Sequence, residues 1–196
     1  MSRTAILLTI LATALLGIGS TRPQPPAAEA STSPRRLGIP PFLNGSGNWA
    51  DSVLSTLSLD ERIAQLMMVA AYSNKDARHE AEIESMVRDR GIGGLIFFQG
   101  GPARQARLTN RYQGAARTPL LLGMDLEWGL GMRLDSTMKF PHQMALGAVQ
   151  DDSLIEAMGS EIARQMRRLG VHVSFSPVVD VNNNPANPVI NDRSFG

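Results

Sequence analysis

Two carboxylates and an aromatic ring stand close together in the segment Asp125-Leu126-Glu127-Trp128-Gly129. Asp125 and Glu127 are two positions apart, so in an extended chain both side chains point the same way. Carboxylates accept hydrogen bonds from hydroxyl groups, and Trp128 offers a flat apolar face, a combination that suits a sugar. A structural role is equally open at this stage, since Asp125 could cap a helix or pair with an arginine.

Two arginines extend this candidate site. Arg133 follows Asp125 by eight residues, and Arg193 lies in the segment Asn191-Asp192-Arg193-Ser194-Phe195-Gly196. A guanidinium group can bind two oxygens of one ligand in a fixed geometry. Most surface arginines are simply solvated, so neither residue indicates a site by itself.

Apolar runs alternate with helical patterns along the chain and would position these residues. Ser58-Leu59-Asp60-Glu61 has the form of a capping box and predicts the start of a short helix. Further helices are expected over 81–90, 103–116 and 152–169, and strands over 66–70, 94–98, 120–124 and 171–175.

The expected strands are continuous apolar runs, which are typical of parallel sheets covered on both faces. Four strand–helix alternations indicate an α/β fold, but the periodicity leaves open a doubly wound sheet or a closed (β/α)8 barrel. Polar residues follow the strands at Gln99, Asp125 and Asp180. In either fold the carboxyl ends of the strands form one face, where the functional site is expected.

The N-terminus predicts export. Arg3 precedes an uncharged apolar stretch, Ala5–Ile18, which is shorter than the roughly 20 residues that span a bilayer. We expect a signal peptide over 1–30 and a proline-rich linker over 31–48, with the mature protein periplasmic or extracellular. The alternatives are a membrane anchor or a buried helix; after cleavage of a signal peptide we expect no membrane span.

Composition excludes several classes of protein. The 196 residues include 19 Lys and Arg, 18 Asp and Glu and no Cys, and the formal net charge is +1. The balanced charge argues against a nucleic-acid partner. The absence of Cys excludes disulfide frameworks, zinc fingers and a Cys nucleophile.

Several segments, taken in order, are similar to those of a known family. They are Leu59–Leu66, Gly91–Ile96, Asp125–Gly129, Phe140-Pro141, Ser176–Val181 and Arg193–Gly196. Together they make residues 58–196 resemble the N-terminal domain of glycoside hydrolase family 3, in its β-N-acetylhexosaminidase branch.

The resemblance implies a (β/α)8 TIM-type barrel over residues 49–196, of which about the first half is present. It also implies release of terminal β-linked N-acetylhexosamine from a glycan by a retaining mechanism. Asp125, Arg133 and Arg193 match the family's sugar-binding residues, and no metal or organic cofactor is implied. A family 3 β-glucosidase and a non-catalytic carbohydrate-binding protein are the alternatives. A phosphate-binding barrel is disfavoured, because the glycines Gly91, Gly93 and Gly94 precede a strand and do not open a helix.

Part of the family pattern is missing from this chain. The segment Lys-His-Phe-Pro-Gly-His-Gly, the acid/base histidine and the nucleophilic Asp all follow Arg-Ser-Phe-Gly in the family, so we assign no catalytic residue here. His142 receives no catalytic role, and His79 and His172 are expected to be structural. The 148 residues from Trp49 also fall short of the roughly 250 of a typical barrel. We therefore expect a fragment of a longer product, inactive alone, with exposed strand edges and an exposed apolar face.

Overall fold

A computed structural model describes residues 47–196, so the expected signal peptide and all but the end of the expected linker lie outside the described residues. Short helices α1 (Asn48–Thr56) and α2 (Leu59–Ala64) come first. The α-helices that follow are α3 (Ala77–Ser85), α4 (Pro102–Ala115), α5 (Gln143–Gly147) and α6 (Asp152–Leu169). Single turns form at η2 (Met86–Arg90, a π-helix), η3 (Leu130–Met132) and η4 (Asn191–Arg193).

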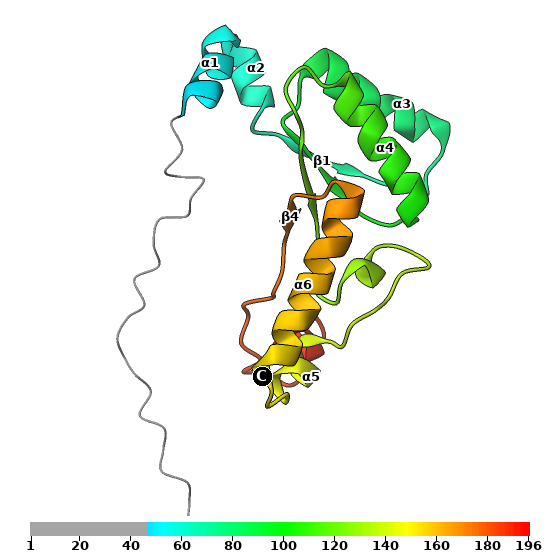
Figure 1. Cartoon of the computed structure of the whole chain (residues 1–196), viewed down its shortest axis with the longest axis vertical. Coiled ribbons are helices and arrows are strands. Elements are labelled where there is room, and N and C mark those ends of the chain that lie inside the picture. The colour runs from blue at the N-terminus through cyan, green and yellow to red at the C-terminus, as the bar shows by residue number, and fades with distance from the viewer. Residues whose placement is uncertain (1–46) are drawn as a thin grey trace, which may run out of the picture. The chain divides into compact units, whose positions relative to one another are not determined.

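A four-stranded parallel sheet lies at the centre of the described residues (Figure 1). Its strands are β1 (Met68–Ala71), β2 (Gly94–Phe97), β3 (Leu121–Met124) and β4 (Val173–Ser174). They are hydrogen-bonded in chain order, β1-β2-β3-β4, and every neighbouring pair is parallel. Because no strand is skipped and each crossover runs the same way round, the sheet winds in one direction, as barrel sheets do.

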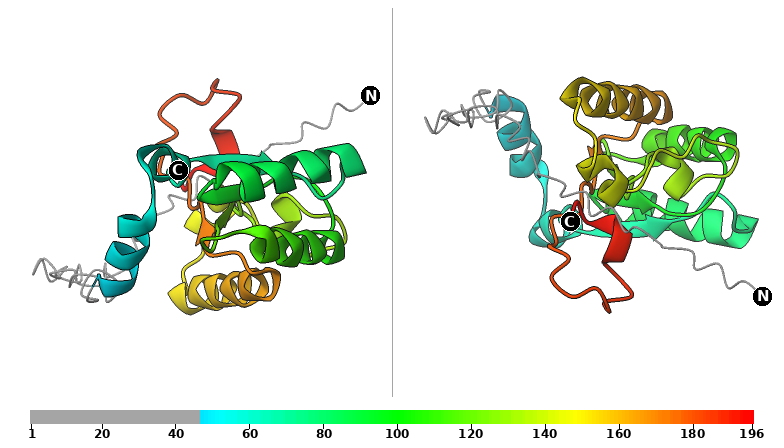
Figure 2. Two further views of the ribbon diagram at one scale, coloured as in Figure 1. Left: turned by 90° about the horizontal axis from the view of Figure 1, so that it is seen from above. Right: turned by 90° about the horizontal axis from the view of Figure 1, so that it is seen from below.

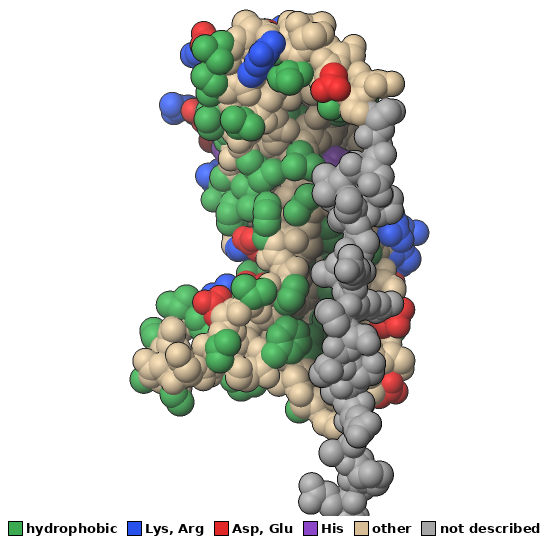
Figure 3. Space-filling view, turned by 90° about the vertical axis from the view of Figure 1, so that its left-hand side faces the viewer, with side chains coloured by type: hydrophobic (Ala, Val, Ile, Leu, Met, Phe, Trp, Pro, Cys, Tyr) green, Lys and Arg blue, Asp and Glu red, His purple; other side chains and the backbone are tan. Residues whose placement is uncertain are grey.

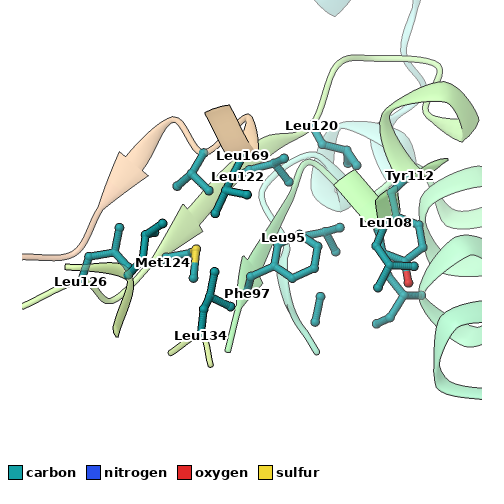
Figure 4. Packing of buried hydrophobic residues seen from close by; sticks show 14 of the residues in the cluster. Leu95, Phe97, Leu108, Tyr112, Leu120, Leu122, Met124, Leu126, Leu134 and Leu169 are labelled. Atoms are coloured by element: carbon teal, nitrogen blue, oxygen red, sulfur yellow. The ribbon is translucent and has the colours of Figure 1, made fainter. Parts of the chain in front are cut away.

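The long helices α3, α4 and α6 follow one another in an arc along one side of the sheet (Figure 2). The core lies between them and the strands. Leu95, Phe97, Leu122 and Met124 are fully buried and pack with Leu108 and Tyr112 of α4 (Figure 4). These strand residues alternate along β2 and β3, so only one face of the sheet carries the helices.

Local sequence signals explain the helix boundaries. The capping box at Ser58 is present, since the Ser58 hydroxyl accepts from the Glu61 amide and the Glu61 carboxylate accepts from the Ser58 amide. Asp151 caps α6, which occupies the predicted range, and Gly170 ends it in the left-handed conformation at φ 69°. These contacts orient each helix against the strand beside it.

Several expectations about single elements are wrong in detail. The helix expected from residue 81 starts at Ala77, because the Asp76 side chain accepts from the His79 amide and caps it there. The fourth strand is only two residues long, and α1 and α5 were not expected. The apolar residues of 152–169 that recur at helical spacing predict one buried stripe, but Leu154 of that set is 61% exposed, whereas Ile162 and Leu169 are buried.

The second face of the sheet has no helices on it in the described part of the chain. Leu121 of β3 and Phe175, directly after β4, are both about half exposed, and β1 and β4 are edge strands. Hydrophobic side chains also gather in the middle of the surface seen from the left-hand side of Figure 1 (Figure 3). The expectation of two covered faces is therefore wrong for these residues, whereas the expected exposed edges and apolar face are observed.

Candidate active site

The loops that follow β2, β3 and β4 meet at the carboxyl end of the sheet. Asp125 is the first residue after β3, and its carboxylate forms an ion pair with Arg133. Both side chains are mostly buried but keep some exposure to solvent. The structure thus brings together two of the three residues expected to bind a ligand. The structural role considered for Asp125, an ion pair with an arginine, is therefore also present. This contact with Arg133 orients the Asp125 carboxylate.

Arg133 is anchored from a second strand end. Its carbonyl oxygen accepts a hydrogen bond from the Gly100 amide at 3.1 Å, and its guanidinium carbon lies 4.7 Å from the centroid of the Phe98 ring. Phe98 and Gly100 follow β2, so the β2 and β3 loops are joined at this residue. A stacked and ion-paired guanidinium has few alternative conformations, which is the geometry needed to present donors to a ligand.

Arg193 pairs with Glu127 and not with Asp125. Its Nε and Nη2 donate to the two carboxylate oxygens of Glu127 at 2.9 and 2.7 Å. The Glu127 side chain is only 4% exposed, against 32% for Arg193. The hydrogen bonds to Glu127 raise the pKa of Arg193 above its ordinary value, with a smaller contribution from the charges of Asp180 and Asp125. Arg193 therefore stays charged and keeps part of its guanidinium open to solvent.

This pair corrects the interpretation of the Asp125-Leu126-Glu127 spacing. The two carboxylates were expected to face one ligand, but each accepts hydrogen bonds from a different arginine. Glu127 is buried, so its role is to hold Arg193. Residues 127 and 193 are 66 positions apart, and no local pattern in the sequence relates them.

Trp128 is also less open than expected. The His142 ring stacks on it with centroids 4.2 Å apart and an interplanar angle of 26°. The same His142 ring also contacts Asp192, with 2.8 Å between Nδ1 and Oδ2. One face of Trp128 is therefore occupied by protein and is not a platform for a sugar.

The two remaining histidines have structural contacts, as expected. The Nε2 atom of His79 accepts from the Tyr72 amide at 3.3 Å, and burial lowers the pKa of His79. The Nδ1 atom of His172 accepts from the Leu122 amide at 3.0 Å, which joins the start of β4 to β3. Within residues 47–196 no group of three His, Asp or Glu side chains is placed to hold a metal ion. No helix among those residues is long and apolar enough to cross a membrane.

Comparison with known proteins places this geometry in a family. Residues 58–196 match the model of the glycosyl hydrolase family 3 N-terminal domain. The chain belongs to glycosyl hydrolase family 3. The match begins at the capping-box residue Ser58 and ends at Gly196, the same range as the resemblance seen in the sequence.

Two curated relatives carry hexosaminidase-type names. The chain is 28% identical over 148 residues to a beta-N-acetylglucosaminidase/beta-glucosidase of Cellulomonas fimi, covering 76% of this chain and 26% of the relative. It is 36% identical over 127 residues to beta-hexosaminidase A of Pseudoalteromonas piscicida, covering 58% of this chain and 21% of the relative. The chain thus spans about a quarter of the length of these relatives.

A solved structure with a similar fold is a beta-glucoside phosphorylase, BglX, bound to 2FGlc. The TM-score is 0.72 at 26% identity, over 81% of this chain and 28% of that one. The described residues therefore have the α/β fold of this domain, with the helices and parallel strands of a partial TIM-type barrel.

Proposed function

We propose that the gene product carrying this chain hydrolyses O-glycosyl bonds and releases terminal β-linked N-acetylhexosamine from a glycan. Its substrate would be an N-acetylglucosamine-containing glycan or a cell-wall sugar. The hexosaminidase names of the two curated relatives support this substrate class. The observation that carries the proposal is the presence of two ion pairs, Asp125 with Arg133 and Glu127 with Arg193, on the loops at the carboxyl end of a parallel sheet.

The three residues have distinct roles in this proposal. Asp125 accepts hydrogen bonds from sugar hydroxyls, and Arg133 holds its carboxylate in place. Arg193, fixed by Glu127, donates from the part of its guanidinium that faces solvent. Charge-assisted hydrogen bonds of this kind can strengthen as the sugar distorts towards the transition state. No cofactor is required by this chemistry.

We assign neither the nucleophile nor the acid/base to residues 47–196. A retaining glycosidase needs a nucleophile and an acid/base group at the scissile bond, and the resemblance gives these as an Asp and a His. Here the carboxylates of Asp125 and Glu127 are each held by an arginine, which suits binding and not attack. Within the proposal both reacting groups belong to other parts of the gene product.

We further propose that the product is exported, on the strength of the apolar segment Ala5–Ile18 and the proline-rich residues that follow it. Cell fractionation with N-terminal sequencing of the mature protein tests this. Recovery from the cytoplasm with residue 1 intact would contradict it.

Hydrolysis of two aryl glycosides by the complete gene product tests the activity. We expect a higher kcat/KM for an aryl β-N-acetylglucosaminide than for the matching β-glucoside. The opposite preference favours the β-glucosidase alternative, which one relative's name and the structural neighbour keep open. When inorganic phosphate is added to the same reaction, we expect the released product to remain the free sugar. Formation of a sugar 1-phosphate would instead indicate a phosphorylase. Sugar binding without turnover would favour the non-catalytic alternative.

A further inference from the structure

Two adjacent residues of the loop after β3 face two adjacent residues of η4. Glu127 binds Arg193 directly, through two hydrogen bonds. Trp128 reaches Asp192 through His142, whose ring stacks on the indole at 4.2 Å and whose Nδ1 lies 2.8 Å from Asp192 Oδ2. The two connections run in parallel between the same pair of segments.

The His142 side chain can make these contacts because it forms no capping hydrogen bond to its own helix. The residue occupies the N-cap position of α5. The backbone next to it is fixed, since the Phe140 amide donates to the Trp128 carbonyl oxygen at 3.0 Å. The imidazole therefore projects from a held segment towards Asp192.

The segment that receives this contact has little support of its own. η4 is a three-residue 3₁₀ turn with no buried residue, and Asn191 in it has a φ of 38°, in the left-handed region. Within the turn the Arg193 amide donates to the Ile190 carbonyl oxygen at 2.8 Å. The Arg193 side chain has one contact to its own segment, from Nη1 to the Val189 carbonyl oxygen at 3.1 Å. Contacts from other segments therefore contribute to the direction in which it leaves the turn.

We propose that His142 is a positioning residue, which fixes η4 through Asp192 and Trp128 and thereby fixes the guanidinium of Arg193. The identity of the ligand rests on the function proposed above, whereas the positioning of Arg193 does not depend on it. His142 takes no part in bond breaking and does not need to touch the sugar.

The positioning claim can be tested on this chain without any ligand. The Nε–H signal of Arg193, assigned in an ¹⁵N-correlated spectrum by its loss in Arg193→Lys, reports the order of the guanidinium. We expect His142→Ala to broaden or abolish this signal. His142→Phe retains a ring to stack on Trp128 but has no Nδ1, and we expect it to impair the signal as well. A sharp, unshifted Arg193 signal in both variants would overturn the proposal.

Substitutions of Asp192 test whether the hydrogen bond is the cause. Asp192→Ala should reproduce His142→Ala, and the double variant should be no worse than either single one, because both remove the same contact. Asp192→Asn keeps an acceptor oxygen and should retain most of the signal. The matched control is Asp135→Ala, which removes an ion pair to Arg104 of similar exposure, 58% for the Asp135 side chain against 57% for Asp192. Additive effects, or an equal loss in the control, would contradict the mechanism.

Titration with N-acetylglucosamine extends the test to binding. Relative to wild type, we expect His142→Ala and Asp192→Ala to weaken the affinity about fivefold and Asp135→Ala to leave it unchanged. If the wild-type chain does not bind the sugar, the proposed function loses support while the Arg193 signal still decides the positioning claim. If the sugar binds equally well in all variants, the positioning of Arg193 by His142 is wrong.

Discussion

Removal of the Arg193 guanidinium is the perturbation whose consequence follows most directly from the geometry. Arg193→Met leaves the Glu127 carboxylate, which is 4% exposed, without its two donors. Loss of one partner from a buried ion pair costs about 3–5 kcal/mol. Because the Arg193 side chain is 32% exposed, water can reach Glu127 after the substitution, and we expect a loss reduced from that range to about 2–3 kcal/mol.

Urea unfolding of the chain, followed by circular dichroism, measures this loss. With a slope of about 2 kcal/mol per molar urea, the midpoint should fall by about 1–1.5 M. Arg164→Met is the matched control, since it removes an arginine–carboxylate pair to Glu161 that lies on the exposed surface of α6. The double variant Glu127→Gln/Arg193→Met should recover part of the stability, because it no longer buries an unpaired charge.

Unfolding of Arg193→Met at the same urea concentration as Arg164→Met would contradict this prediction. That outcome would mean that Glu127 is hydrated in the folded protein and that the pair does not hold η4. Equal losses in the single and the double variant would instead assign the effect to packing of the arginine side chain.

Three further predictions concern stability. Burial raises the pKa of Tyr112 to about 12. The stability that the neutral Tyr112 side chain contributes is therefore complete below pH 10 and is lost as the pH rises through 12. Absorbance at 295 nm, with the second tyrosine replaced by Phe, should show this late titration. Hydrogen bonds from the backbone amide and the hydroxyl of Ser58 lower the pKa of Glu61, so stability present above pH 4.5 is lost at lower pH. Glu61→Gln removes the titrating group and should flatten this loss in acid unfolding. A Cβ at Gly93 would lie 1.9 Å from a backbone carbonyl oxygen, whereas Gly114 in α4 has nothing within 4 Å. Thermal unfolding should therefore show Gly93→Ala destabilised by about 2–4 kcal/mol and Gly114→Ala stabilised by up to about 1 kcal/mol.

The sequence predicted the elements whose signals are local. The capping box at Ser58, the helical pattern of 152–169 and the apolar runs of the strands all depend on residues close in the chain. The α/β class followed from their alternation. The start of α3 was misplaced because Asp76 as a cap extends the helix by one turn beyond its apolar pattern.

Contacts between distant segments could not be predicted in this way. Glu127 and Arg193 are 66 residues apart, and His142 and Asp192 are 50 apart. The two-residue spacing predicted that Asp125 and Glu127 act together. In the structure Glu127 is buried and binds Arg193, whereas Asp125 is partly exposed and binds Arg133. Asp125, Arg133 and Arg193 were selected by resemblance to a family, and the structure adds what holds each of them.

The most direct test of the account is kcat/KM of the complete gene product on an aryl β-N-acetylglucosaminide, compared between wild type and Asp125→Ala. Asp125 is the residue that the account places against the sugar hydroxyls, held there by Arg133. We predict a loss of about 1–3 kcal/mol of transition-state binding, or roughly 5- to 150-fold in kcat/KM, with an unchanged circular dichroism spectrum. An unchanged kcat/KM in a folded variant would remove Asp125 from the site and contradict the account.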